Sequence, residues 1–162
     1  MNTPNATPMT ARDFMVVDLV TLAPTADVVD AVQTLLEHRI SGAPVVDASG
    51  RYLGMFSEKC AMQVLLDAAY EVLPTCEVRA FMDTEAQTIA PHTHLLSIAQ
   101  VFLLTPYRRL PVVEDGLLVG QVSRRDVLRV WMDAIDQVPR RSAKSRLLYW
   151  SALFERHEAP LA

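Results

Sequence analysis

The apolar positions of the chain predict a short strand, a helix, a hairpin and a second helix in its first half. The segment after Asp27 has one helix face with apolar residues at i, i+3, i+4, i+7 and i+8, and Asp27 is a typical N-cap. That face consists of Val28, Ala31, Val32, Leu35 and Leu36. Residues 43–47 and 52–56 are two apolar runs around a turn-rich segment, which predicts a hairpin. Residues 20–22 predict the strand and 58–73 the second helix, which ends near Pro74.

The second half repeats this order. Thr21-Leu-Ala-Pro24 corresponds to Thr88-Ile-Ala-Pro91, and each proline lies 20 residues before the proline of the next strand, Pro44 or Pro111. The halves therefore align at an offset of 67, which falls to 66 after the hairpin turn, where Gly54 pairs with Gly120. The predicted elements of this half are 87–90, 95–105, 110–114, 117–122 and 124–137.

Each half is a β-α-β-β-α unit, so the fold class is α/β, in the α+β sense. One unit buries too little apolar surface alone, so the two repeats should pack sheet to sheet with pseudo-two-fold symmetry. The expected division is a flexible lead at 1–10, repeats at 11–75 and 76–138, and a helical tail at 139–162. The tail has Leu147, Trp150 and Phe154 on one face, which predicts packing on the module or on a dimer partner. Docking of RNA or of an anionic partner is the alternative.

Composition narrows the function classes. Half of the chain is apolar (51%) and its net charge is −4, which argues against a general nucleic-acid or membrane-surface binder. The first ten residues do not form a secretory signal, and Asp67 and Glu71 interrupt the longest apolar stretch. These features predict a soluble cytoplasmic protein without a membrane span. Cys60 and Cys76 lack metal-ligand spacing, so we expect reduced thiols and no metal site.

Both halves resemble the CBS domain family over residues 11–138. The first half carries Ile40-Ser-Gly-Ala-Pro44-Val-Val-Asp47 and Gly50-Arg-Tyr-Leu-Gly54-Met-Phe-Ser57-Glu-Lys, and the second carries the same pattern in register. The resemblance implies a module with two clefts between its repeats, which often forms homodimers. Such clefts commonly bind AMP, ADP, ATP or related adenosyl compounds. In the family, the acidic residue that closes a Gly-x-x-Ser/Thr-x-x-Asp motif holds the ribose.

The second repeat matches that motif as Gly120-Gln-Val-Ser123-Arg-Arg-Asp126. The Asp126 carboxylate would accept hydrogen bonds from the ribose hydroxyls, while Ser123 and the N–H groups of a helix start favour phosphate. The arginines expected to add phosphate contacts are Arg108, Arg109, Arg124 and Arg125. The residues expected beside the adenine are Leu110, Pro111, Val112 and, near the preceding strand, Thr88.

The first repeat has Cys60 where the motif requires the carboxylate, which removes one charged hydrogen-bond acceptor. We therefore predict one competent nucleotide site per chain and a weaker, degenerate second site. The residues of that degenerate site are Thr21, Gly42, Ala43, Pro44, Ser57 and Lys59.

These motifs leave two functions open. The first is a regulatory sensor that binds an adenine nucleotide as a ligand, with no obligatory cofactor, and acts on a separate partner protein. The second is a ligand-free scaffold for dimerisation and docking, in which Ser123 and Asp126 only cap a helix. No sequence context supports a catalytic triad, and the residues after 138 are too few for a catalytic domain, so we expect no enzyme activity.

Overall fold

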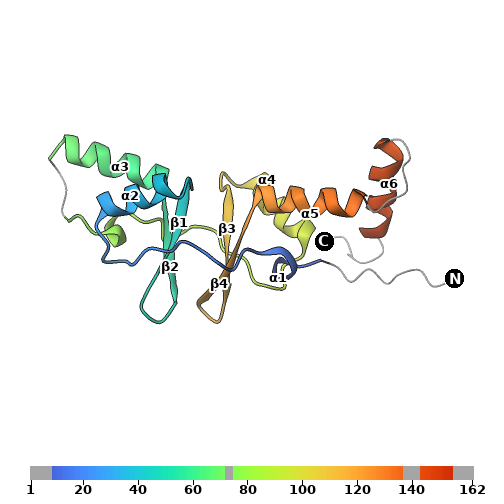
Figure 1. Ribbon diagram of the computed structural model, residues 1–162, viewed down its shortest axis with the longest axis horizontal. Coiled ribbons are helices and arrows are strands. Elements are labelled where there is room, and N and C mark those ends of the chain that lie inside the picture. Colours follow the sequence, from blue (N-terminus) through green and yellow to red (C-terminus); the bar gives the residue numbers. More distant parts are fainter. Residues whose placement is uncertain (1–8, 72–74, 137–142, 155–162) are drawn as a thin grey trace.

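Two β-hairpins stand side by side in the middle of the molecule, with their helices on the outer flanks (Figure 1). The structure is a computed structural model that describes residues 9–71, 75–136 and 143–154. The first hairpin joins β1 (Gly42–Val46) to β2 (Tyr52–Ser57), and the second joins β3 (Arg109–Glu114) to β4 (Leu117–Ser123). The flanking helices are α2 (Val28–Glu37), α3 (Glu58–Ala69), α4 (Leu95–Leu104) and α5 (Arg124–Asp136). This arrangement confirms the predicted mixed fold of two repeats.

The strand predicted at the start of each repeat is reduced to a single parallel bridge. Leu22 bridges to Val45, and Ile89 bridges to Val112 at the same place of the second repeat. A proline follows each bridge two residues later, as Pro24 or Pro91. Because proline has no N–H group to donate, it cannot extend the ladder, and the strand stops there.

The helices begin where the sequence predicts, and two details differ. Asp27 caps α2 by accepting a hydrogen bond from the Val29 N–H at 2.8 Å, as predicted. Leu36 is 71% exposed, so its predicted place on the buried face is wrong. Helix α3 ends at Ala69 rather than at residue 73, because Glu71 takes a positive φ of 58° that a helix cannot continue.

The alignment offset between the repeats falls from 67 to 66 because the second hairpin turn is one residue shorter than the first. In the first turn, one oxygen of Asp47 accepts hydrogen bonds from the Ser49 N–H, the Ser49 hydroxyl and the Arg51 N–H. In the second turn, Asp115 and Gly116 both have positive φ, which is the conformation of a tight two-residue turn. The shorter turn removes one residue without changing the strand pairing.

Each repeat donates a short segment to the core of the other. Residues 10–16, which include α1 (Ala11–Phe14), pack on the second repeat, where Val16 and Gln121 exchange two backbone hydrogen bonds of 2.9 Å. Residues 77–83, which include the 3-10 helix η1 (Val78–Ala80), pack on the first repeat. There Asp83 and Met55 exchange the equivalent bonds at 2.8 and 2.9 Å.

The exchanged segments are themselves a repeat at the offset of 67. Phe14-Met15 in one corresponds to Phe81-Met82 in the other. Periodicity alone could not predict this correspondence, because the segments are too short to show a helical or strand period. Each core therefore combines residues from both sides of the boundary predicted between residues 75 and 76, and the predicted repeat bounds of 11–75 and 76–138 stay predictions.

The predicted tail helix is present as α6 (Ala143–Phe154) and packs against α5. The rings of Trp131 and Trp150 meet edge to face with their centroids 6.2 Å apart, and Arg146 donates to Asp136 at 2.8 Å. The side chain of Phe154 and residues 1–8 of the predicted lead lie outside the described part. No helix among the described residues has the length and apolar character needed to cross a membrane.

Candidate functional site

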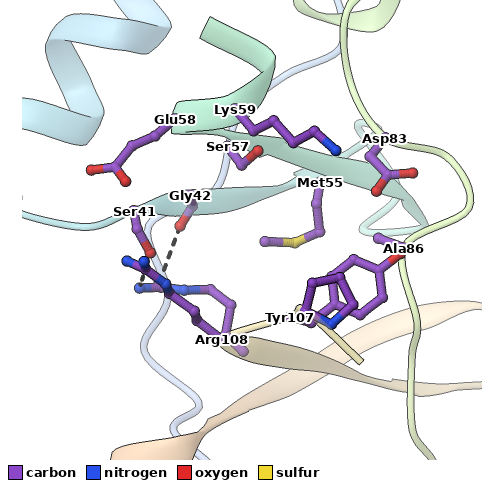
Figure 2. Close-up of a pocket in the computed structure, with 12 residues that line it drawn as sticks. Ser41, Gly42, Met55, Ser57, Glu58, Lys59, Asp83, Ala86, Tyr107 and Arg108 are labelled. Carbon is purple, nitrogen blue, oxygen red and sulfur yellow. Dashed lines mark hydrogen bonds between the residues drawn. The ribbon is translucent and has the colours of Figure 1, made fainter. Parts of the chain in front are cut away.

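A cleft of about 350 Å³ opens between the two repeats, and we call it the first cleft because β2 and the start of α3 form one wall (Figure 2). The chain just before and at the start of β3 forms the opposite wall, and the exchanged segment closes one end. Its lining residues are Ser41, Gly42, Met55, Ser57, Glu58, Lys59, Asp83, Ala86, Pro106, Tyr107, Arg108 and Arg109.

Arg109 ties the two repeats together inside this cleft. Its guanidinium donates to the Gly42 carbonyl at 3.1 Å and to the Ser41 hydroxyl at 3.2 Å. Its Nε–H is buried and has no hydrogen-bond partner among the described residues. Burial lowers the pKa of Arg109, while the carboxylates of Asp126 and Glu58 act in the opposite direction. A buried cation with an unused donor is a suitable place for an anionic group.

The N-terminus of α3 faces the same end of the cleft. Ser57 caps this helix by accepting a hydrogen bond from the Cys60 N–H at 3.3 Å, and Lys59 and Arg108 are exposed at the rim. The Cys60 sulfur contacts the Ser57 hydroxyl and the Met55 carbonyl, and its side chain is buried. Cys60 therefore packs as the inert thiol that the sequence predicts, and it supplies no carboxylate to the cleft.

The other end of the cleft combines an apolar slot with polar groups that the sequence analysis did not single out. Met55, Ala86 and Tyr107 gather there, and the amino group of Lys59 points toward Asp83 (Figure 2). One oxygen of Asp83 accepts a hydrogen bond from the Glu85 N–H at 3.0 Å.

Tyr52 does not line the cleft, although Asp83 and Tyr107 of the cleft act on it electrostatically. Its hydroxyl is buried without a hydrogen-bond partner among the described residues. Burial raises the pKa of Tyr52 well above its usual value, and the charges of Asp83 and Tyr107 add to the shift. At the offset of 67, Asp83 corresponds to Val16. This change from an apolar to an acidic residue is the sequence signal that could have shown that the repeats differ at this end of the cleft.

The motif of the second repeat forms a compact hydrogen-bonded group, which we call the second site. One oxygen of Asp126 accepts from the Ser123 N–H at 2.8 Å and from the Ser123 hydroxyl at 2.6 Å, and the Asp126 N–H donates back to that hydroxyl. The other oxygen accepts from Arg129 at 3.2 Å. This geometry is the reciprocal helix cap that the sequence left as an alternative. The two carboxylate oxygens together can accept about four hydrogen bonds, so Asp126 keeps some capacity for a ligand.

The four arginines predicted to contact phosphate lie at different places in the structure. Arg124 donates to the carbonyls of Phe102 and Thr105 and lies over the Phe102 ring, so its own repeat holds it. Arg125 is exposed at the first turn of α5. Arg108 and Arg109, which the sequence assigned to the second site, line the first cleft instead. The reason is that the start of β3 faces the first repeat across the interface.

The remaining predicted residues serve mainly the two cores. Leu110, Pro111 and Val112 are fully buried, and so are Ala43 and Pro44 at the equivalent place. Thr88 is half-buried and Thr21 is exposed on the segments that carry the parallel bridges. Of the degenerate site, the first cleft contains Gly42, Ser57 and Lys59. Three of the four residues predicted beside the adenine, Leu110, Pro111 and Val112, are thus buried, whereas Thr88 is partly accessible.

Comparison with known proteins agrees with this repeated architecture. The model of the CBS domain matches residues 11–67 and, a second time, residues 78–133. The chain belongs to the CBS domain family. The exchanged segments and the first cleft therefore lie within a pair of CBS domains.

Solved and curated relatives give the same result. The chain is 30% identical to CBSX2 of Arabidopsis thaliana, solved in complex with AMP, with a TM-score of 0.69 over 76% of this chain and 96% of that one. It is 27% identical to the uncharacterised protein MJ1225 of Methanocaldococcus jannaschii over 74% of its own length. It is 26% identical to the A-adding tRNA nucleotidyltransferase of Aquifex aeolicus over 78% of its own length. The chain spans only 41% and 15% of these last two proteins.

Proposed function

We propose that this pair of CBS domains is a regulatory module that binds an adenosyl ligand, in the first place an adenine nucleotide, at the second site. The observation that carries the proposal is the Asp126 carboxylate, which Ser123 fixes at the start of α5 with its side chain still 13% exposed. The AMP complex of the relative CBSX2 supports an adenosyl ligand.

The chemistry of the second site suits a ribose phosphate. A ribose hydroxyl would donate to the remaining lone pair of Asp126, on the oxygen that accepts from Arg129, and the first-turn N–H groups of α5 would face the phosphate. Arg125, exposed on the same turn, supplies a charge-assisted contact. The first cleft has no carboxylate at the equivalent place because Cys60 stands there, so we propose one adenine-nucleotide site per chain.

Regulation requires a ligand that binds two arrangements of the repeats with different affinities. The repeats meet through Arg109 and through two backbone hydrogen bonds, from Tyr52 to Gly116 and from Leu118 to Gly50, of 3.0 and 3.1 Å. A ligand at the second site lies next to this seam, since Arg109 is within electrostatic reach of Asp126. The regulated activity then belongs to a partner protein and not to residues 9–154.

A homodimer is part of the proposal. Apolar side chains on α3 and α5 are between 49% and 61% exposed, and they are Met62, Leu65, Leu66, Leu128 and Met132. A second copy would cover this surface. Leu65→Glu is expected to convert a dimer to a monomer in light scattering, whereas Val17→Glu, at a 69% exposed residue outside α3 and α5, is the control that leaves the dimer intact. A monomeric wild-type chain would refute the dimer.

A ligand-free scaffold is the second candidate, and one observation favours it. Ser123 and Arg129 already occupy both oxygens of Asp126, so the carboxylate has a complete structural role as a helix cap.

A thermal-shift panel separates the two candidates. Adenine nucleotides and adenosylmethionine are added to wild type, to Asp126→Ala and to the matched variant Cys60→Ala. A ligand at 100 times its Kd stabilises the folded chain by about 2.7 kcal/mol, which is several degrees in Tm. We expect the shift in wild type and Cys60→Ala and its loss in Asp126→Ala. No shift with any adenosyl ligand would leave the scaffold.

A further inference from the structure

The last turn of α4 exposes two neighbouring leucines. Leu103 is 85% exposed and Leu104 is 83% exposed, the two highest values among the large apolar side chains of the described residues. Single exposed leucines are common on soluble proteins, whereas an apolar patch rimmed by charged groups is typical of an interaction site. The charges around this turn therefore decide whether it is such a site.

Three exposed arginines lie around the end of α4. Arg124 donates to the carbonyls of Phe102 and Thr105 at 3.1 and 3.2 Å, which places its guanidinium at the C-terminal end of the helix. Its backbone N–H donates to the Arg108 carbonyl at 3.3 Å, and Arg125 follows it on the first turn of α5. Helices α4 and α5 pack together (Figure 1). We call this surface the basic leucine patch, and its residues are Leu103, Leu104, Arg108, Arg124 and Arg125.

The positive charge of this patch is not balanced by neighbouring acids. No acidic residue occurs between Glu85 and Glu114 in the sequence, so α4 and the segment after it carry no carboxylate. The carboxylate of the second site accepts from its helix cap and from another arginine instead. No ion pair joins Arg108, Arg124 or Arg125 to an acid among the described residues. A chain of net charge −4 thus has a local positive surface around two leucines.

The equivalent corner of the first repeat has a different charge. Its residues at the offsets of 67 and 66 are Leu36, Glu37, Ser41, Glu58 and Lys59. Leu36 is 71% exposed, so an exposed leucine is shared by the two repeats. The second leucine and the cluster of arginines are not shared, since that corner has acids in their place. The repeated fold therefore does not require the basic leucine patch.

We propose that the basic leucine patch is the docking surface for a partner segment that combines apolar with acidic side chains, such as an acidic amphipathic helix. Its apolar side chains would cover Leu103 and Leu104, and its carboxylates would form ion pairs with Arg108 and Arg125. The net charge of −4 disfavours an anionic membrane, and the patch has no aromatic side chain on which a nucleic-acid base could stack. The inference goes beyond the proposed function and does not depend on a nucleotide at either site.

Fluorescence anisotropy of a labelled peptide built of repeated Glu-Glu-Leu-Leu units, titrated with the full chain, tests the proposal. The same peptide with lysine in place of glutamate is the control for charge. We expect the acidic peptide to bind wild type and to lose about tenfold or more in affinity in the double variant Leu103→Ser/Leu104→Ser, because two buried leucines are removed. Leu36→Ser, at the equivalent exposed position, should leave the affinity within about twofold.

The charged part of the patch is tested by single variants. Arg108→Gln and Arg125→Gln should each weaken the acidic peptide by about threefold, the effect of one exposed ion pair. Lys59→Gln, at the position equivalent to Arg125, is the matched control and should not change its affinity. Raising the salt concentration from about 0.05 M to about 0.5 M should also weaken the peptide on wild type, because exposed charges are screened.

Several outcomes would overturn the inference. No binding of the acidic peptide, tighter binding of the lysine peptide, or an equal loss in Leu36→Ser would do so. Tighter binding of phosphatidylserine vesicles or of a single-stranded RNA than of the peptide would assign the patch to a membrane or to nucleic acid. A monomer formed by Leu103→Ser/Leu104→Ser from a wild-type dimer would assign it to a second copy. AMP affinity should be unchanged in this double variant, so the inference and the proposed function fail separately.

Discussion

The first cleft and the second site have the same backbone arrangement, but their carboxylates lie at different positions. Both lie at a helix start beside a hairpin, and both meet a segment exchanged from the other repeat. The second site fixes a carboxylate on its helix at Asp126, whereas the first cleft has Cys60 there and carries Asp83 on the exchanged segment. The comparison teaches that the repeated fold provides equivalent positions at the helix start and on the exchanged segment, and that each repeat fills these positions with different side chains.

The two repeats also contribute different side chains to the interface between them. Arg109 reaches from the second repeat to Ser41 and Gly42 of the first. The residue equivalent to Arg109 at the offset of 67 is Gly42 itself, which has no side chain to reach back. One side of the pseudo-two-fold arrangement is thus clamped by a charged side chain and the other is not.

The largest effect on stability is expected from the exchanged segment of the first repeat. In Gly54→Ala, the new Cβ would lie 2.7 Å from the backbone oxygen of Asp83, which cannot move without breaking its bonds to Met55. We expect a loss of about 3 kcal/mol in the free energy of unfolding, measured by urea denaturation.

Gly120→Ala is the matched variant in the second repeat. There the new Cβ would meet the side chain of Met15, with its sulfur at 2.6 Å, and a methionine can change rotamer. The expected loss is about 1 kcal/mol. An equal loss in both variants would show that the exchanged segments are held equally tightly, and would break this part of the comparison.

An effect smaller than that of Gly54→Ala is expected from the clamp formed by Arg109. Arg109→Ala removes two hydrogen bonds between the repeats, and we expect a loss of about 2 kcal/mol in the free energy of unfolding. Arg108→Ala is the control, because this neighbour is exposed and its removal should change stability by no more than about 0.5 kcal/mol. If the two variants unfold at the same urea concentration, Arg109 does not hold the repeats together.

Local features of the fold could be predicted from the sequence because they depend on neighbouring residues. Asp27 caps its helix, Pro24 and Pro91 end the first strands, and the Asp115-Gly116 pair makes a tight turn. The family could also be predicted from the sequence, because two copies of the motifs in register are far more specific than a single copy.

The features that could not be predicted depend on how the repeats pack. The exchange of residues 10–16 and 77–83 joins segments that no periodicity connects. The place of Arg109 in the first cleft follows from which way the start of β3 faces across the interface. Leu110 and Val112 were expected beside a ligand, and both are buried, because an apolar strand between two layers packs into the core.

The central claim, that the two repeats are chemically unequal, is tested most directly by the stoichiometry of AMP in an isothermal titration of the full chain. The account predicts one AMP per chain in wild type and in Asp83→Asn, and much weaker AMP binding in Asp126→Ala. The expected loss of affinity in that variant is about 10- to 100-fold, the effect of removing a charged hydrogen-bond acceptor. Two AMP molecules per wild-type chain, or one bound with unchanged affinity to Asp126→Ala, would contradict the account.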